Sequence, residues 1–193
     1  KFAYIRIEQY FLPAFQAYTI DETERYRIYR NERGVVLREM NENVSMPHFI
    51  DYPIKTRADY HALRERLVGS SEQRFPADWG AVVAHFRHQE REIVGVHMDG
   101  FFGYPRELMG VECLLLTLYD DPELVTQIIT DHLQVNLKLF PRLIEEIRPD
   151  FAFIWEDMSY KGGPLISPAM FRRFMLPAYK ELTDFLKRMG IKI

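Results

Sequence analysis

The sequence is poor in cysteine, in net charge and in long hydrophobic runs, and each shortage excludes a class of protein. The single cysteine, Cys113, has no partner for an intrachain disulfide and excludes a zinc site built from several cysteines. This cysteine usage is typical of reducing compartments, so we expect a cytoplasmic protein. No run reaches the ~18 uninterrupted apolar residues of a membrane-spanning helix. No signal peptide is predicted, because no charged and then apolar leader opens the chain.

The charge balance excludes one further class. The 25 Lys and Arg residues are offset by 28 Asp and Glu residues, which gives a net charge of −3 and does not favour a general nucleic-acid-binding protein. Hydrophobic residues make up 47% of the chain and charged residues 27%, so the composition is that of a folded protein and not of a disordered one.

The two ends of the sequence indicate that it is part of a longer domain. The first residue is Lys1 and not methionine. Near the other end, a long helical pattern stops at Gly190, and residues 191–193 open a strand-like alternation. We therefore expect that some active-site residues lie outside this window.

A β-rich region precedes the rest of the chain. Residues 25–30 alternate between charged and apolar side chains, residues 31–34 form a turn signal, and residues 35–40 continue the pattern. This pattern predicts an antiparallel hairpin with one exposed face, inside a β-structured excursion over about 24–52. Such an exposed hairpin is a candidate arm for a homodimer.

From residue 57 onward, helical and strand patterns alternate. The runs 93–98 and 151–157 are short and mostly apolar, which predicts strands buried on both faces in a mainly parallel sheet joined by right-handed crossovers. A doubly wound sheet and a (β/α)8 barrel both fit one domain over 1–193, although no Gly-x-Gly-x-x-Gly motif for a dinucleotide follows either strand. Helices are predicted over 57–68, about 78–90, from about Pro105 to 117, from about 121 to 147 with His132 on the apolar stripe, and from Pro168 to Met189 with a break at Pro177.

Polar side chains follow the first apolar strand. The alternation of a strand places His97 and Asp99 on the same face, where an imidazole beside a carboxylate can transfer protons or bind a metal. The alternative is a histidine that is simply hydrogen-bonded at a strand end. Gly103 and Tyr104 lie in the next loop, where a substrate can approach the backbone closely.

The second apolar strand ends in two adjacent carboxylates, Glu156 and Asp157. A carboxylate at the end of an apolar strand needs a partner or water, and such groups often belong to catalytic sites. The alternative is an acid that anchors a loop by accepting backbone N–H groups. Tyr160 and Lys161 follow in a glycine-containing loop that suits an anionic substrate or, alternatively, is only solvated.

Two segments resemble the uroporphyrinogen decarboxylase superfamily. The first is FAFIWEDMSYKGGPLISPAMF with LPAYK after it, in residues 151–190, and the second is Gly-Tyr-Pro-Arg-Glu-Leu-Met at 103–109. The resemblance covers about 93–193 and implies a (β/α)8 TIM barrel, incomplete in this chain.

The resemblance implies two chemistries. The decarboxylases of porphyrin biosynthesis act on uroporphyrinogen without a cofactor, whereas the related methyltransferases use a zinc-activated thiol and a corrinoid protein. The tyrosine of the decarboxylases falls at Val111 in this sequence, which favours the methyltransferases. We therefore expect a corrinoid-linked methyltransferase for a small methylated metabolite, whose zinc ligands would follow residue 193. Its pocket would be lined by the four polar residues of the strand ends, His97, Asp99, Glu156 and Asp157.

Two alternatives remain open. One is a uroporphyrinogen-type decarboxylase, in which a carboxylate holds the pyrrole N–H groups and stabilises the protonated pyrrole. The other is a non-catalytic module that binds a tetrapyrrole or a corrinoid.

Overall fold

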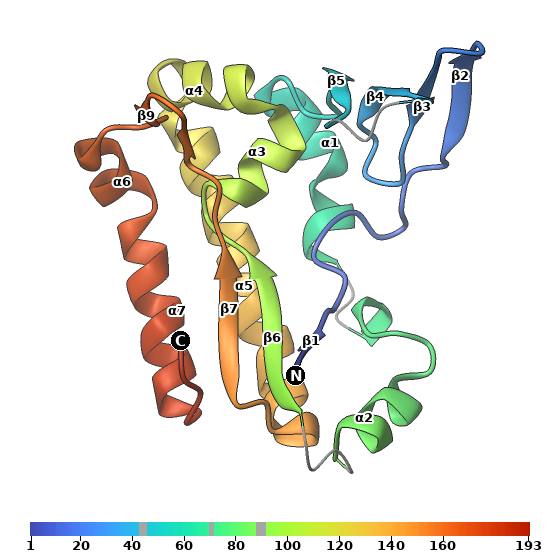
Figure 1. Ribbon diagram of the computed structural model, residues 1–193. Coiled ribbons are helices and arrows are strands. Elements are labelled where there is room, and N and C mark those ends of the chain that lie inside the picture. The colour runs from blue at the N-terminus through green and yellow to red at the C-terminus, as the bar shows by residue number, and fades with distance from the viewer. Residues whose placement is uncertain (43–45, 70–71, 88–91) are drawn as a thin grey trace.

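A parallel sheet of three strands lies at the centre of the structure, a computed structural model that describes residues 1–42, 46–69, 72–87 and 92–193 (Figure 1). The strand order is β1 (Phe2–Ile5), β6 (Ile93–Asp99) and β7 (Phe151–Trp155). Both neighbouring pairs are parallel, with Ile5 opposite Val96 and His97 opposite Phe153. The two predicted apolar strands are therefore confirmed as neighbours in a parallel sheet.

The predicted (β/α)8 barrel is wrong for the part of the chain that the structure describes. The parallel sheet there has three strands and one further parallel bridge between Phe151 and Lys192, and it does not close into a ring. The reason is that helix–strand alternation predicts parallel pairing but does not determine how many strands follow or whether they close. Between β1 and β6 the chain forms an antiparallel sheet in place of further strand–helix units.

The antiparallel sheet has the order β2 (Tyr18–Glu22), β3 (Tyr26–Arg30), β4 (Val36–Met40) and β5 (His48–Asp51). The predicted hairpin is confirmed as β3 and β4, and Figure 1 shows this sheet projecting from one side of the molecule. Residues 43–45 of the predicted excursion lie outside the described residues.

The helices follow the predicted pattern with one exception. A single helix was expected after Pro105, but Gly110 has a φ of 80° and divides it in two. The predicted break near Pro177 is confirmed, and residues 88–90 of the predicted 78–90 helix lie outside the described residues. The helices are α1 (Arg57–Val68), α2 (Trp79–Arg87), α3 (Gly103–Met109), α4 (Val111–Asp120), α5 (Pro122–Ile147), α6 (Pro168–Phe174) and α7 (Leu176–Arg188). A 3₁₀ turn covers Glu72–Arg74, and a small hairpin consists of β8 (Ser159–Tyr160) and β9 (Gly163–Pro164).

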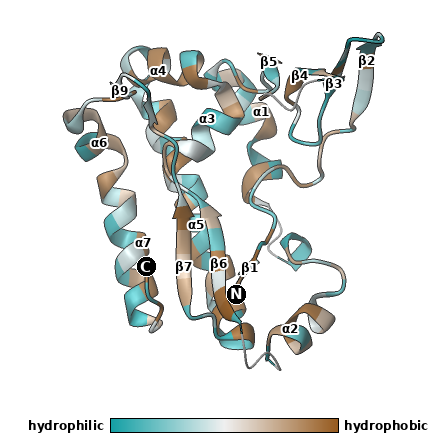
Figure 2. Ribbon diagram, in the orientation of Figure 1, coloured by the Kyte–Doolittle hydropathy of each residue, from teal (hydrophilic) through white to brown (hydrophobic). Residues whose placement is uncertain are grey.

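The helices cover one face of the parallel sheet. Val96 and Met98 of β6 belong to the same buried cluster as Phe140 of α5 and Leu182 of α7. In Figure 2, α5 and α7 carry both hydrophobic and hydrophilic colours, as expected for helices buried on one side. Among the described residues, no helix combines the length and the apolar character that crossing a bilayer requires.

The other face of the parallel sheet is open, so the prediction that its strands are buried on both faces is wrong. Phe2 is 60% exposed, Tyr4 45% and Phe153 39%, although parallel sheets are usually covered on both faces. Strand alternation places His97 and Asp99 on this same face. The polar end of the sheet is therefore accessible from solvent.

A buried arginine fixes the segment that follows β1. The Arg74 side chain is 1% exposed, and burial lowers the pKa of its guanidinium because the charged form is poorly solvated there. No carboxylate pairs with it among the described residues, and backbone carbonyls accept its N–H groups instead. These carbonyls belong to Glu8, Tyr10, Arg66, Leu67 and Gly69, so the guanidinium ties the segment after β1 to the end of α1.

Replacement of this arginine should destabilise the protein. Arg74→Met fills similar space but leaves several buried carbonyls without a donor, so we expect a loss of about 3 kcal/mol in the free energy of unfolding. Arg172→Met, at an exposed position on α6, should change it by less than about 0.5 kcal/mol. Urea denaturation of both variants measures the difference. Equal stabilities would contradict the proposed role of Arg74 in holding the segment after β1 to the end of α1.

Candidate functional site

Three parallel strands end at the same edge, and a cavity of about 510 Å³ opens beside the ends of β1 and β6. Its polar lining comes from the segment after β1, from the last residues of β6, from Arg33 and from residues 73–74. These residues are Arg6, Glu8, Gln9, Tyr10, Arg33, Gln73, Arg74, His97 and Asp99. Ligand sites of open α/β sheets lie at this edge, so the cavity is the candidate site.

Asp99 is held firmly by groups from the segment after β1. The Tyr10 hydroxyl donates to Asp99 Oδ2 at 2.5 Å. The Gln9 side chain bridges the two strands, because its Nε2 donates to the His97 carbonyl at 3.1 Å and its Oε1 accepts from the Asp99 N–H at 3.4 Å. Asp99 Oδ1 accepts no hydrogen bond from the described residues, so it remains available to a ligand.

The Tyr10 phenol stays protonated. Burial raises its pKa well above the usual value, and the negative charge of Asp99 raises it further, although the nearby Arg33 opposes this. Tyr10 therefore acts as a permanent hydrogen-bond donor to Asp99 at neutral pH. The Arg33 guanidinium lies 3.8 Å from the centre of the Tyr10 ring and covers it.

His97 is neutral at pH 7. Burial lowers its pKa below the ordinary 6.5, Asp99 opposes this shift, and the positive charge of Arg6 adds to it. Arg6 itself is exposed and forms no ion pair with any described residue. The cavity lining thus includes an exposed guanidinium, a neutral imidazole and the two carboxylates of Glu8 and Asp99.

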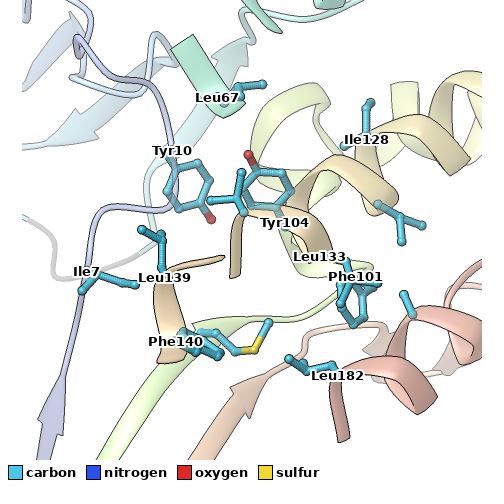
Figure 3. Close-up of a cluster of buried hydrophobic side chains, with 14 of the residues drawn as sticks. Ile7, Tyr10, Leu67, Phe101, Tyr104, Ile128, Leu133, Leu139, Phe140 and Leu182 are labelled. Atoms are coloured by element: carbon cyan, nitrogen blue, oxygen red, sulfur yellow. The ribbon is translucent and has the colours of Figure 1, made fainter. Parts of the chain in front are cut away.

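A second layer of side chains supports the end of β6 from α5. His132 Nε2 lies 2.9 Å from the Asp99 carbonyl oxygen, and its ring stacks on Tyr104 with 3.7 Å between ring centres. Burial lowers the pKa of His132 to about 4, so the ring is neutral and donates this bond. Tyr104 also lies next to Tyr10 (Figure 3), and their ring centres are 5.2 Å apart.

Glu156 lies at the same edge of the sheet but anchors the backbone. Its Oε1 accepts the Phe102 N–H and its Oε2 the Gly103 N–H, both at 2.9 Å, at the start of α3. The Tyr179 hydroxyl of α7 donates to the same carboxylate. A side chain at Gly100 would lie 2.2 Å from Glu156 Oε1, so only glycine leaves room for this contact. Glu156 therefore occupies the geometry of the loop-anchoring alternative.

The other predicted site residues lie apart from the cavity. Asp157 forms an ion pair with Arg106, and Gly103 and Tyr104 are buried in α3. Tyr160 and Lys161 are exposed on the β8–β9 hairpin and do not line the cavity. The structure thus brings His97 and Asp99 together with three residues that the sequence did not single out, Arg6, Gln9 and Tyr10.

The described residues do not by themselves supply a zinc site. Within the described ranges, no group of three or more His, Cys, Asp or Glu side chains is arranged to hold a metal ion. The comparisons add no relative: no family model, curated protein or solved structure matches this chain.

The anchoring role of Glu156 predicts a stability effect. Glu156→Gln replaces one acceptor oxygen with an NH2 group that faces a backbone N–H, so we expect a loss of about 2–3 kcal/mol in the free energy of unfolding. Asp157→Asn breaks a pair with a half-exposed carboxylate and should cost less than about 1 kcal/mol. Thermal and urea unfolding compare the two variants. A Glu156→Gln protein of wild-type stability would refute the anchor.

The buried imidazole predicts a loss of stability in acid. The pKa of His132 is about 4 in the folded state and 6.5 in the unfolded reference, so the unfolded chain binds the extra proton first as the pH falls. The contribution of His132 to stability should therefore decrease between pH 6.5 and 4, by about 3 kcal/mol in total. Urea titrations across this range should show a shallower pH dependence for His132→Gln. The exposed His61→Gln control should follow the wild type.

Proposed function

We propose that this chain is an enzyme that removes a carboxyl group from a small anionic substrate in the cavity beside β1 and β6. One observation carries the proposal: the guanidinium of Arg6, which forms no ion pair with any described residue, lines the same cavity as His97 and Asp99. A guanidinium without a protein partner is available for a substrate carboxylate, with which it can form two parallel hydrogen bonds. The carboxylate of Asp99 lines the same cavity, where it can interact with positive charge on the rest of a substrate.

The residues have separate roles in this proposal. Arg6 binds and orients the anion, and Asp99 uses its free Oδ1 to stabilise positive charge on a protonated substrate. In the reaction a proton from solvent first adds to the substrate, the bond to the carboxyl carbon breaks, its electron pair moves to the protonated part of the substrate, and carbon dioxide leaves. A second proton from solvent then adds to the carbon and the first returns to solvent, so the net change is the uptake of one proton and the release of carbon dioxide. Tyr10 keeps Asp99 oriented throughout because its hydroxyl donates to Oδ2.

One fact favours decarboxylation over the methyl transfer that the resemblance suggested. The argument against a decarboxylase was the missing phenol at Val111, but Tyr10 brings a phenol to Asp99 from another part of the chain. Kinship with the uroporphyrinogen decarboxylase superfamily, corrinoid-linked methyl transfer, and a non-catalytic tetrapyrrole- or corrinoid-binding module remain predictions.

A panel of small mono- and dicarboxylic acids tests the proposal. Isothermal titration should find an acid that binds, and carbon dioxide release should accompany its turnover. Arg6→Gln should weaken binding at least about tenfold because the charge-assisted contact is lost. Asp99→Asn should keep the binding and lose the release of carbon dioxide.

Arg172→Gln is the matched control, because this arginine is exposed on α6 and does not line the cavity. This variant should bind and react like the wild type. Two results would count against the proposal. Binding that Arg6→Gln leaves unchanged would place the anion elsewhere. Binding without any carbon dioxide release would favour the non-catalytic module.

A further inference from the structure

A second and larger cavity lies away from the candidate site, between the edge of the antiparallel sheet and the junction of α3 and α4. It has a volume of about 920 Å³ and is lined by residues 47–52, 55–57, 109–113 and several positions up to 124. Four apolar side chains of this groove are strongly exposed: Phe49 at 40%, Ile50 at 46%, Val111 at 40% and Leu116 at 58%. Exposed apolar side chains gathered in one groove are typical of a binding surface.

One wall of the groove is a free strand edge. β5 (His48–Asp51) is the last strand of its sheet, and β4 pairs with it on one side only. No backbone hydrogen bond outside that pairing involves its residues within the described chain. The strand itself contains neither proline nor lysine, the residues that usually protect an edge from pairing with another chain. A partner strand can therefore add along β5 and direct alternate side chains into the groove.

The charge of the groove indicates which charge a bound partner should carry. Its two cationic residues are already paired, Lys55 with Asp51 and Arg57 with Asp121. Glu112 and Asp120 also line the groove, are exposed, and form no ion pair with any described residue. The groove thus combines an apolar floor with uncompensated negative charge, and it complements a segment that is apolar and basic.

We propose that this groove binds an extended peptide segment in which apolar and basic residues alternate, by strand addition to β5. The backbone of the segment would pair with β5, its apolar side chains would contact Phe49, Ile50 and Leu116, and its basic side chains would approach Glu112 and Asp120. This interaction surface is independent of the proposed decarboxylation, since none of its residues lines the first cavity.

The single cysteine provides a reporter for this interaction. Cys113 lines the groove and is half-buried, so a fluorine label on its thiol senses an occupant directly. Three blocked octapeptides serve as probes: one that alternates lysine and valine, its twin with glutamate for lysine, and a copy of the first with every second amide N-methylated. We expect the basic peptide to shift the fluorine signal saturably. The acidic and the N-methylated peptides should bind at least about tenfold more weakly, because one lacks the charge and the other the strand pairing.

Variants assign the binding to the groove. The double replacement of Glu112→Lys and Asp120→Lys should weaken the basic peptide about tenfold and strengthen the acidic twin. The matched control replaces two exposed acids of α7, Glu181→Lys and Asp184→Lys, and should leave both affinities unchanged. Leu116→Ala should weaken the basic peptide without exchanging the charge preference.

Three outcomes would overturn the proposal. The basic peptide fails to bind, or the N-methylated copy binds equally well, or the fluorine signal shifts with protein concentration in the absence of peptide. The last result would identify a second copy of this chain as the occupant. The proposal stands apart from the proposed enzymatic function, because Arg6→Gln should not affect any of these measurements.

Discussion

The carboxylate of Glu156 connects the three parts of the structure that define the polar edge of the parallel sheet. It lies at the end of β7, it accepts the N–H groups of Phe102 and Gly103 at the start of α3, and it accepts the hydroxyl of Tyr179 from α7. The first N–H groups of a helix have no acceptor within the helix, and a negative charge at that end also favours the helix dipole. The position of α3 over the sheet, and with it the turn after Asp99, therefore depends on this acid.

The carboxylates at this edge of the sheet therefore have different roles. Glu156 is occupied by three donors and does not line the cavity, whereas Asp99 lines it and keeps one oxygen without a hydrogen-bond partner among the described residues. Asp99 is itself fixed from two sides: its carboxylate by Tyr10, and its carbonyl by His132. A carboxylate held in this way loses little entropy when a substrate binds, which is the physical advantage of a preformed site.

The sequence predicted local structure well and the long-range arrangement poorly. Apolar periodicity found β6, β7 and the helices, and the proline and glycine signals found most of their ends. The sequence could not show that the sheet stays open, because the pattern of each strand says nothing about how many strands follow or whether they close into a barrel. The position of Gly110 in a left-handed conformation divided a helix whose apolar pattern was continuous.

The residues of the candidate site were found only in part from the sequence, because local patterns do not show which distant segments meet. Alternation along β6 placed His97 and Asp99 on one face, and the stripe of α5 predicted that His132 is buried. The partner of Asp99 is 89 residues away along the chain, and β1, which brings Tyr10 and Arg6 to the cavity, is too short to show a periodic pattern. A strand-end acid that anchors a loop and one that faces a ligand have the same sequence signature, so only the structure separates Glu156 from Asp99.

Native-state hydrogen exchange tests most directly whether Glu156 is the acid that anchors the backbone. The amides of Phe102 and Gly103 should exchange far more slowly than those of Glu112 and Cys113, which begin α4 after a glycine without a side-chain cap. Equal and rapid exchange at both helix starts would show that Glu156 does not hold this edge together.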